Sequence, residues 1–380
     1  MHFKTVLILL VVAVLSGCSS LQSGSEPYKR FVVNAEWVQD TLKKTNLEFR
    51  KVNRMSPVIY KKSVIVGNSL DGLVSYDLQT RNQNWRVNIP NGVEASGTLI
   101  RDRLFSGSNN GKMYSIDLMT GAVLWTFDTK SELVAEPLLD EGVLYFISGS
   151  QSLYALDAST GRQIWIHNRQ DTSNSMTIRG GSRPSIAGGI IYAGFSDGSL
   201  VALNAKTGTE QWEITLNRDA RFRDIDSSPV LDGDRIYINS YDDKLYCLST
   251  EKGEIIWSAP VGGASTPLIA GDRIYTTSSK GELLAVAKKD AAILWRRKAS
   301  DGIFTDPVSY LDLIVAGESQ GKLVFLDAAS GQLAGSFEPG RGVFSRPTVN
   351  DNMVSFVSGE GNAYGVRAEY STKASIKYLK

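Results

Sequence analysis

Few side chains of this sequence could carry out chemistry. Two histidines and two cysteines occur among 380 residues, namely His2, His167, Cys18 and Cys247. They are too few and too scattered for a histidine-rich metal site, a cysteine cluster or a haem-attachment motif. A nucleophilic triad would depend on His167 alone, and no glycine-rich phosphate loop leads from a strand into a helix. The sequence therefore favours a binding protein, without catalytic residues, metal or cofactor, over an enzyme.

The amino terminus has the pattern of a cleaved and lipid-modified leader. Lys4 precedes an apolar segment, residues 6–15, which is shorter than a membrane-spanning helix. The sequence Leu-Ser-Gly-Cys that ends at Cys18 resembles the lipobox of bacterial lipoproteins. The resemblance implies cleavage before Cys18 and acylation of that cysteine, which would anchor the protein in a membrane. Ser19 replaces the aspartate of many inner-membrane lipoproteins, so we expect the periplasmic side of the outer membrane.

The signal peptide is therefore expected to be residues 1–17, followed by a lipidated flexible tether over residues 18–30. Removing residues 1–17 takes away one lysine and no acid, which leaves 40 basic and 40 acidic residues. A net charge of zero argues against nucleic acid, or anionic lipid, as a broad electrostatic partner.

The tryptophans reveal an internal repeat. They are 48, 40, 40, 47, 45 and 38 residues apart, and the equivalent position 40 residues after the last one is Gly335. The seven tryptophans are Trp37, Trp85, Trp125, Trp165, Trp212, Trp257 and Trp295. A period near 40 residues indicates propeller blades or another repeat array. This register predicts eight units along the chain.

Two further registers accompany the tryptophans. A proline lies 28 residues before most of these positions, as Pro137 does before Trp165, and Pro347 opens the last unit. Because proline cannot donate to a sheet, we expect it at the start of an edge strand. A polar residue, often aspartate, lies eight residues before the tryptophan position, as Asp157 does, and starts a turn that ends in glycine.

Each unit has the pattern of four short strands with alternating apolar residues. In the fourth unit we expect strands at residues 185–187, 190–194, 199–203 and 210–214. Eight such sheets bury both faces when they are arranged radially. The predicted fold class is therefore all-β, an eight-bladed β-propeller of four-stranded blades over residues 31–367.

The two ends of the propeller are expected to meet in one blade. The last unit has no tryptophan strand of its own, and Trp37 has no preceding strands of its own unit. We therefore expect an N-terminal strand at residues 33–38 to complete the last blade. Residues 368–380 are polar and weakly patterned, and form the predicted carboxyl-terminal tail.

The repeated text resembles the repeats of propellers of the pyrroloquinoline-quinone (PQQ) type, and is clearest at Leu153-Tyr-Ala-Leu-Asp-Ala-Ser-Thr-Gly161. The resemblance covers nearly the whole mature chain. It implies that tryptophans dock neighbouring blades, with each indole packed on a peptide plane of the next blade and its N–H bound to a buried acceptor. We expect this blade-docking role for all seven tryptophans.

A quinone-dependent dehydrogenase is one alternative function. The quinone of such enzymes usually stacks on a ring formed by two neighbouring cysteines, and Cys247 has no such neighbour. Asp224 and Asp226 lie close together, but two carboxylates do not hold a metal without further ligands. A propeller that binds a small ligand of the cell envelope is the other alternative that the sequence leaves open.

Two loops are longer than their counterparts. The interval from a tryptophan to the next proline position is 12 residues after Trp85, Trp125 and Trp295, but 19 after Trp165 and 17 after Trp212. It is also long, at 20 residues, after Trp37. Loops of one type emerge on one face of a propeller, and enlarged neighbouring loops on a rigid scaffold are candidates for function. We expect the loops after Trp165 and Trp212 to form a partner site.

The contents of these two loops, with the lipobox and the eight blades, resemble the BamB family. These are lipoproteins of the outer-membrane β-barrel assembly machinery, the BAM complex. The resemblance implies binding to the periplasmic polypeptide-transport-associated (POTRA) domains of BamA, and a role in the assembly and insertion of outer-membrane β-barrel proteins. It assigns partner binding to Met176, Ile178, Arg179, Asp224 and Asp226. The family favours leucine at the first two positions, from which this sequence departs in shape.

These residues suit distinct roles in recognition. Met176 and Ile178 would anchor the partner, and Arg179 would make a charge-assisted contact. Asp224 and Asp226 would orient Arg179 or meet a basic residue of the partner. A purely internal pairing of Arg179 with one of the two acids remains open. Unfolded outer-membrane proteins could also pair with edge strands, although a closed ring exposes only short edges.

Overall fold

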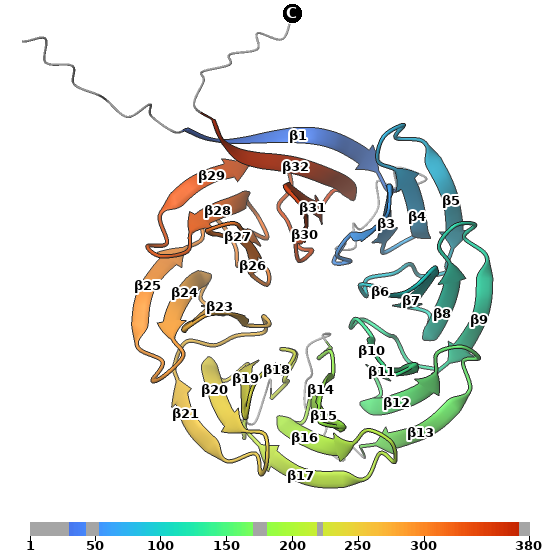
Figure 1. Ribbon diagram of the computed structural model, residues 1–380, viewed down its shortest axis with the longest axis vertical. Helices are drawn as coiled ribbons and strands as arrows, with labels where there is room; N and C mark the ends of the chain where they lie inside the picture. Colours follow the sequence, from blue (N-terminus) through green and yellow to red (C-terminus); the bar gives the residue numbers. More distant parts are fainter. Residues whose placement is uncertain (1–29, 43–52, 170–180, 219–222, 372–380) are drawn as a thin grey trace, which may run out of the picture. The chain divides into compact units, whose positions relative to one another are not determined.

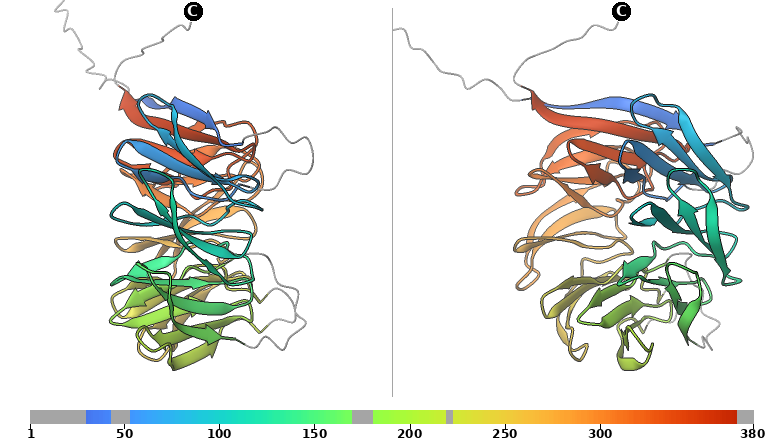
Figure 2. Two further views of the ribbon diagram at one scale, coloured as in Figure 1. Left: turned by 90° about the vertical axis from the view of Figure 1, so that its right-hand side faces the viewer. Right: turned by 45° about the vertical axis from the view of Figure 1, so that its right-hand side comes forward.

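The computed structural model describes residues 30–42, 53–169, 181–218 and 223–371. Its compact unit is Phe31–Glu369. Within the described residues the chain forms eight antiparallel sheets of four strands each. In Figure 1 these sheets stand as blades around a common centre, and the side views of Figure 2 show the blades next to one another in one ring. The predicted all-β, eight-bladed propeller is confirmed.

Blades 1 to 7 each use four consecutive strands, from the innermost to the outermost. Blade 1 contains β2 (Val58–Tyr60), β3 (Ser63–Asn68), β4 (Gly72–Asp77) and β5 (Gln83–Asn88), and blade 2 contains β6 (Thr98–Ile100), β7 (Arg103–Gly107), β8 (Lys112–Asp117) and β9 (Val123–Asp128). Blade 3 contains β10 (Leu138–Asp140), β11 (Val143–Ile147), β12 (Ser152–Asp157) and β13 (Gln163–Asn168), and blade 4 contains β14 (Ser185–Ala187), β15 (Ile190–Gly194), β16 (Ser199–Asn204) and β17 (Glu210–Thr215). Blade 5 contains β18 (Val230–Asp232), β19 (Arg235–Ser240), β20 (Lys244–Ser249) and β21 (Ile255–Ala259), and blade 6 contains β22 (Leu268–Ala270), β23 (Arg273–Thr277), β24 (Glu282–Ala287) and β25 (Ile293–Lys298). Blade 7 contains β26 (Val308–Tyr310), β27 (Leu313–Gly317), β28 (Leu323–Asp327) and β29 (Leu333–Phe337).

Blade 8 joins the two ends of the propeller. It contains β30 (Thr348–Asn350), β31 (Met353–Val357), β32 (Asn362–Ser371) and, as its outer strand, β1 (Arg30–Asp40). The expected closure by an N-terminal strand is therefore confirmed, and the observed strand is longer than the predicted residues 33–38. Strand β32 also continues through residues 368–371, the first residues of the predicted tail.

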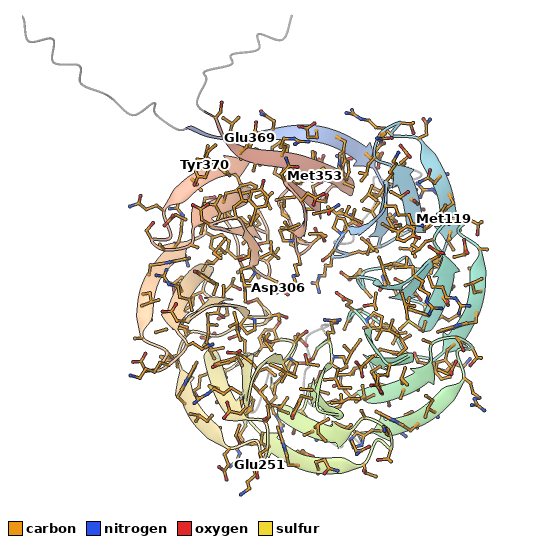
Figure 3. The ribbon with its side chains drawn as sticks, viewed as in Figure 1. Met119, Glu251, Asp306, Met353, Glu369 and Tyr370 are labelled. Atoms are coloured by element: carbon orange, nitrogen blue, oxygen red, sulfur yellow. The ribbon has the colours of Figure 1, made fainter. Side chains whose placement is uncertain are left out.

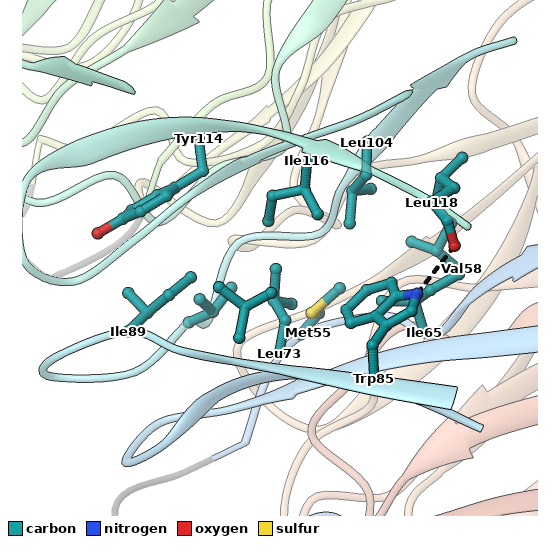
Figure 4. Close-up of a cluster of buried hydrophobic side chains, with 12 residues drawn as sticks. Met55, Val58, Ile65, Leu73, Trp85, Ile89, Leu104, Tyr114, Ile116 and Leu118 are labelled. Carbon is teal, nitrogen blue, oxygen red and sulfur yellow. Dashed lines mark hydrogen bonds between the residues drawn. The ribbon is translucent and has the colours of Figure 1, made fainter. Parts of the chain in front are cut away.

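Seven of the eight inner strands begin directly after the proline of their unit, as β14 begins after Pro184, and the inner strand β6 begins after Gly97. The inner strand pairs on one side only, so the missing proline N–H costs no hydrogen bond of the sheet. The apolar faces of neighbouring blades pack together in continuous clusters. One of them, between blades 1 and 2, is drawn in Figure 4 and includes Met55, Ile65, Leu73, Trp85, Leu104 and Ile116.

A β-bulge precedes most of the tryptophans. In blade 3, Ala155 pairs with Trp165 and Leu156 pairs with Gln163, so Ile164 has no partner across the sheet. The same shift occurs in blades 1, 2, 4, 5, 6 and 7. A bulge bends its strand and redirects the side chains beside it, which accounts for the repeated aim of the indole toward the next blade.

Five indoles donate their N–H to a backbone carbonyl of the next blade. Trp85 binds the carbonyl of Leu118 at 2.8 Å, the dashed line in Figure 4, and Trp165 binds that of Ala205 at 2.9 Å. The other three bonds join Trp125 to Ala158, Trp212 to Thr250 and Trp295 to Ala328. In all five cases the accepting turn ends in a glycine at positive φ, and a Cβ there would lie within 3 Å of the indole.

Two tryptophans pack against the next blade without the predicted hydrogen bond to it. Trp37 donates to the sulfur of Met353 in its own blade, and the buried Nε1 of Trp257 has no hydrogen-bond partner in the described part of the chain. The residue in place of the turn glycine is Arg81 for the first and Ala291 for the second, both at positive φ. A side chain at that position keeps the indole from the close approach that the carbonyl bond requires.

Candidate partner-binding surface

Each of the two enlarged loops connects the outer strand of one blade to the inner strand of the next blade. The first leads from β13 to β14, and the second leads from β17 to β18. Three of the predicted partner-binding residues, Met176, Ile178 and Arg179, lie outside the described residues, as does the predicted lipidation site Cys18. Asp224 and Asp226 are described, and both lie near the end of the second loop.

An arginine clamp holds the start of the first loop. The Nη2 atom of Arg169 lies 2.5 Å from a carboxylate oxygen of Asp197 and 2.7 Å from one of Glu213. Its guanidinium also stacks over the ring of Phe195, at 4.9 Å from the centroid. Hydrogen bonding to Arg169 lowers the pKa of Glu213 in spite of partial burial. The clamp therefore ties this loop to blade 4. The first loop leads into that blade and the second loop leads out of it.

Sequence reasoning missed this clamp. Asp197 was visible only as part of the Asp-Gly turn between β15 and β16, and Glu213 only as the residue after Trp212. The available signal was an arginine at the base of an enlarged loop, two residues after His167. One partner lies in the turn between β15 and β16 and the other lies within β17. Their proximity follows from the fold of blade 4 and not from spacing along the chain.

The end of the second loop is packed into the propeller. Ile225 is buried, its amide donates to the carbonyl of Phe195 at 3.2 Å, and its side chain fills the space beside Gly194, where a Cβ would lie 2.5 Å away. Asp224 is fully buried. Its carboxylate is therefore placed to orient neighbouring groups, and not to meet a partner at the surface.

Asp226 has an unusual protonation equilibrium. Burial, and next the charge of Asp224, raise the pKa of Asp226 to about 7, while Arg54 and a hydrogen bond with Tyr241 oppose the rise. Burial and the two acids also raise the pKa of the Tyr241 hydroxyl. Because its pKa is about 7, the carboxyl of Asp226 can change charge near neutral pH. Asp226 also lines a cavity at the centre of the blades, at the edge of the candidate surface.

The described residues contain no group of three or more His, Cys, Asp or Glu side chains arranged to hold a metal ion. Cys247 is a free thiol, fully buried in blade 5, and burial raises its pKa. In the same part of the chain, no helix is long and apolar enough to cross a membrane. The geometry offers loops, a clamp and a charged cavity, which suit binding.

Comparison with known proteins gives one consistent family. The sequence model described as outer membrane protein assembly factor BamB matches residues 70–297 and 225–373. The protein of that name from Kangiella koreensis is 30% identical over 364 residues, which are 91% of this chain and 92% of that protein. The one from Shewanella oneidensis is 24% identical over 200 residues, and there the match spans only 50% of each protein.

Solved structures share the fold. The crystal structure of BamB from Moraxella catarrhalis matches with a TM-score of 0.76 at 19% identity, covering 88% of this chain and 100% of that one. A quinohemoprotein alcohol dehydrogenase from Comamonas testosteroni matches with a TM-score of 0.70 at 14% identity, covering 88% and 76%. At such identities the likeness extends to the propeller alone, so the dehydrogenase match carries no quinone chemistry to this chain.

Proposed function

We propose, because the chain belongs to the family of the outer membrane protein assembly factor BamB, that it is a non-catalytic scaffold that aids the assembly of outer-membrane β-barrel proteins. The observation that carries this proposal is the 30% identity to a family member over 91% of the chain. The protein would be acylated at Cys18, held at the periplasmic side of the outer membrane and joined to the barrel-assembly complex through the POTRA domains of BamA.

The partner surface is proposed to be the two enlarged loops. Their described ends belong to adjacent blades, and the clamp at Arg169 fixes one of them to the propeller. Met176 and Ile178 would supply the apolar anchors, and Arg179 the charged contact. The burial of Asp224 favours, of the two roles considered for the acids, orientation of Arg179 over direct contact with the partner. Truncation of such a positioned arginine is commonly costly at an interface.

The test is binding of the purified mature protein to purified POTRA domains. Arg179→Ala is expected to weaken binding by about 30-fold, which corresponds to the roughly 2 kcal/mol of an interface hot spot. Asp224→Asn should weaken it as well, because the neutral amide no longer holds the guanidinium. Arg296→Ala serves as the matched control, since that side chain is 55% exposed on the outer strand β25 and outside both loops.

The melting temperature of each variant separates loss of binding from loss of fold. Unchanged binding by the folded double variant Arg179→Ala, Asp224→Asn would move the partner site away from these loops. Loss of binding by Arg296→Ala to the same degree would show that the effect is not specific to them.

A further inference from the structure

A cavity of about 800 Å³ lies at the inner ends of the blades. Its wall includes, from every blade, the residue that precedes the proline position before the inner strand. In blades 1 to 4 these residues are Ser56, Ser96, Glu136 and Arg183. In blades 5 to 8 they are Ser228, Thr266, Asp306 and Arg346. The order hydroxyl, hydroxyl, acid, arginine thus occurs twice around the ring.

This order places an acid beside an arginine at two positions across the cavity from each other. Arg183 Nε lies 3.3 Å from a carboxylate oxygen of Glu136, and the charge of Arg346 acts on Asp306. Blades 4 and 8, which carry the arginines, are on opposite sides of the ring in Figure 1, and Figure 3 shows Asp306 at its inner edge. Two guanidinium groups therefore border the same space from opposite sides.

One oxygen of each acid of the ring, Glu136 Oε1 and Asp306 Oδ1, is engaged by neighbouring groups of the protein. Glu136 accepts a hydrogen bond from the hydroxyl of Thr98 at 3.2 Å, besides its ion pair with Arg183. Asp306 accepts the backbone N–H of Thr266 at 3.1 Å. These carboxylates are accordingly placed to hold neighbouring donors of the protein.

The donors of the ring are in surplus. A guanidinium has five N–H donors. Within the described residues the exposed Arg346 makes no hydrogen bond and no ion pair, and the Nε of Arg183, although 3.3 Å from Glu136, makes no hydrogen bond. The hydroxyls of Ser96 and Ser228 accept the backbone N–H groups of Ser56 and Arg183, at 2.9 and 3.0 Å. Each hydroxyl therefore keeps its own O–H to donate.

We propose that this cavity binds a small molecule bearing a carboxylate or phosphate oxyanion between Arg183 and Arg346. Planar guanidinium groups match such oxyanions with two parallel hydrogen bonds, and the hydroxyls of Ser96 and Ser228 supply further donors. The cavity is large enough for a ligand of metabolite size. The loops of the proposed partner surface border it at Arg183 and Asp226, but the ligand site does not depend on that surface.

The charge of the remaining wall makes this binding sensitive to pH. Arg54, Glu94, Asp226 and Asp232 also line the cavity, and Asp232 is paired with Lys288 at 2.5 Å. Burial raises the pKa of Asp306, and burial together with Asp224 raises the pKa of Asp226 to about 7 against the opposing effects of Arg54 and Tyr241. Acidification from pH 8 to pH 6 therefore removes negative charge from the site and should tighten binding of an anion.

The test is calorimetric titration of the full mature protein with sulfate, inorganic phosphate and succinate. The first two probe phosphate-like ligands and the third probes carboxylates, and sulfate keeps its charge between pH 6 and pH 8. We expect one anion to bind per protein, more tightly at pH 6 than at pH 8 for sulfate. Arg346→Gln, at an exposed residue that should not disturb folding, is expected to weaken binding at least about 10-fold, and Arg183→Gln to act likewise.

Arg296→Gln is the control for loss of one positive charge away from the cavity, and its affinity should equal that of the wild type. The proposal is overturned if none of the three anions binds the folded wild-type protein at pH 6. It is equally overturned if Arg346→Gln binds as tightly as the wild type, or if the control loses affinity to the same extent. Preference for succinate over both inorganic anions would assign the site to a carboxylate ligand, and the reverse would assign it to a phosphate ligand.

Discussion

At the scale of single residues, the glycine of the turn decides whether an indole can hydrogen-bond to the next blade. In all five joints where this glycine is present with its tryptophan, the indole binds a carbonyl of the next blade. At the joint between blades 5 and 6 the glycine is replaced by Ala291, at φ 58°, and Trp257 has no partner for its N–H in the described chain. At this joint, therefore, an alanine in a left-handed backbone conformation coincides with an indole N–H that lacks an acceptor.

Ala291→Gly should stabilise the propeller. Glycine relieves the left-handed backbone strain, a gain of about 1 kcal/mol, and lets Trp257 approach the carbonyl of Lys288.

Gly253→Ala is the converse change at the preceding joint, where the Cβ would lie 2.6 Å from the Trp212 ring. It should cost about 2 kcal/mol through strain and overpacking. Urea unfolding of the three proteins measures both effects, and a destabilised Ala291→Gly variant would contradict this explanation.

At the scale of elements, the repeat was sufficient to predict the blades because each register has one physical cause. Prolines such as Pro184 directly precede strands that pair on one side only. The turn aspartates accept hydrogen bonds from backbone N–H groups of the residues that follow them. Asp157, for example, accepts from the side chains and amides of Ser159 and Thr160, which lower its pKa to about 2. The closing strand was predictable because the last unit lacked a tryptophan strand, and the amino-terminal end supplied one, at Trp37, that had no unit of its own.

The site was less predictable than the fold. The two loops stood out by their lengths, but the Arg169 clamp and the burial of Asp224 depend on contacts between separate strands, which spacing along the chain does not reveal. The ring of residues before the prolines was visible only after eight distant positions were brought around one cavity. Met176, Ile178 and Arg179 remain predictions of the sequence.

The closing strand β1 offers a test at this scale. Trp37 is 5% exposed and packs with residues of both blade 8 and blade 1, and the carbonyl of Asp40 accepts the hydroxyl of Tyr76. Deletion of residues 31–40 should therefore lower the free energy of unfolding by at least about 4 kcal/mol, the cost of removing one large buried side chain. Deletion of residues 19–28, in the predicted tether, is the matched control. Equal melting temperatures for the wild type and the 31–40 deletion would contradict the role of closure.

At the scale of the whole molecule, a closed ring is a rigid support for loops that differ. Equivalent strands recur in eight blades, and such regularity concentrates specificity in the few connections that break it. The described ends of the two enlarged loops lie in adjacent blades, one of them held by Arg169. The propeller can thus present a surface to a partner while its centre is available to a ligand.

The most direct measurement of the proposed scaffold role is affinity purification of the lipid-anchored protein from solubilised envelope membranes, followed by identification of the copurifying proteins. The account predicts that the POTRA-containing subunit of the barrel-assembly complex is recovered with the wild type and depleted with Arg179→Ala. Recovery of the folded wild-type protein without that subunit would contradict the account.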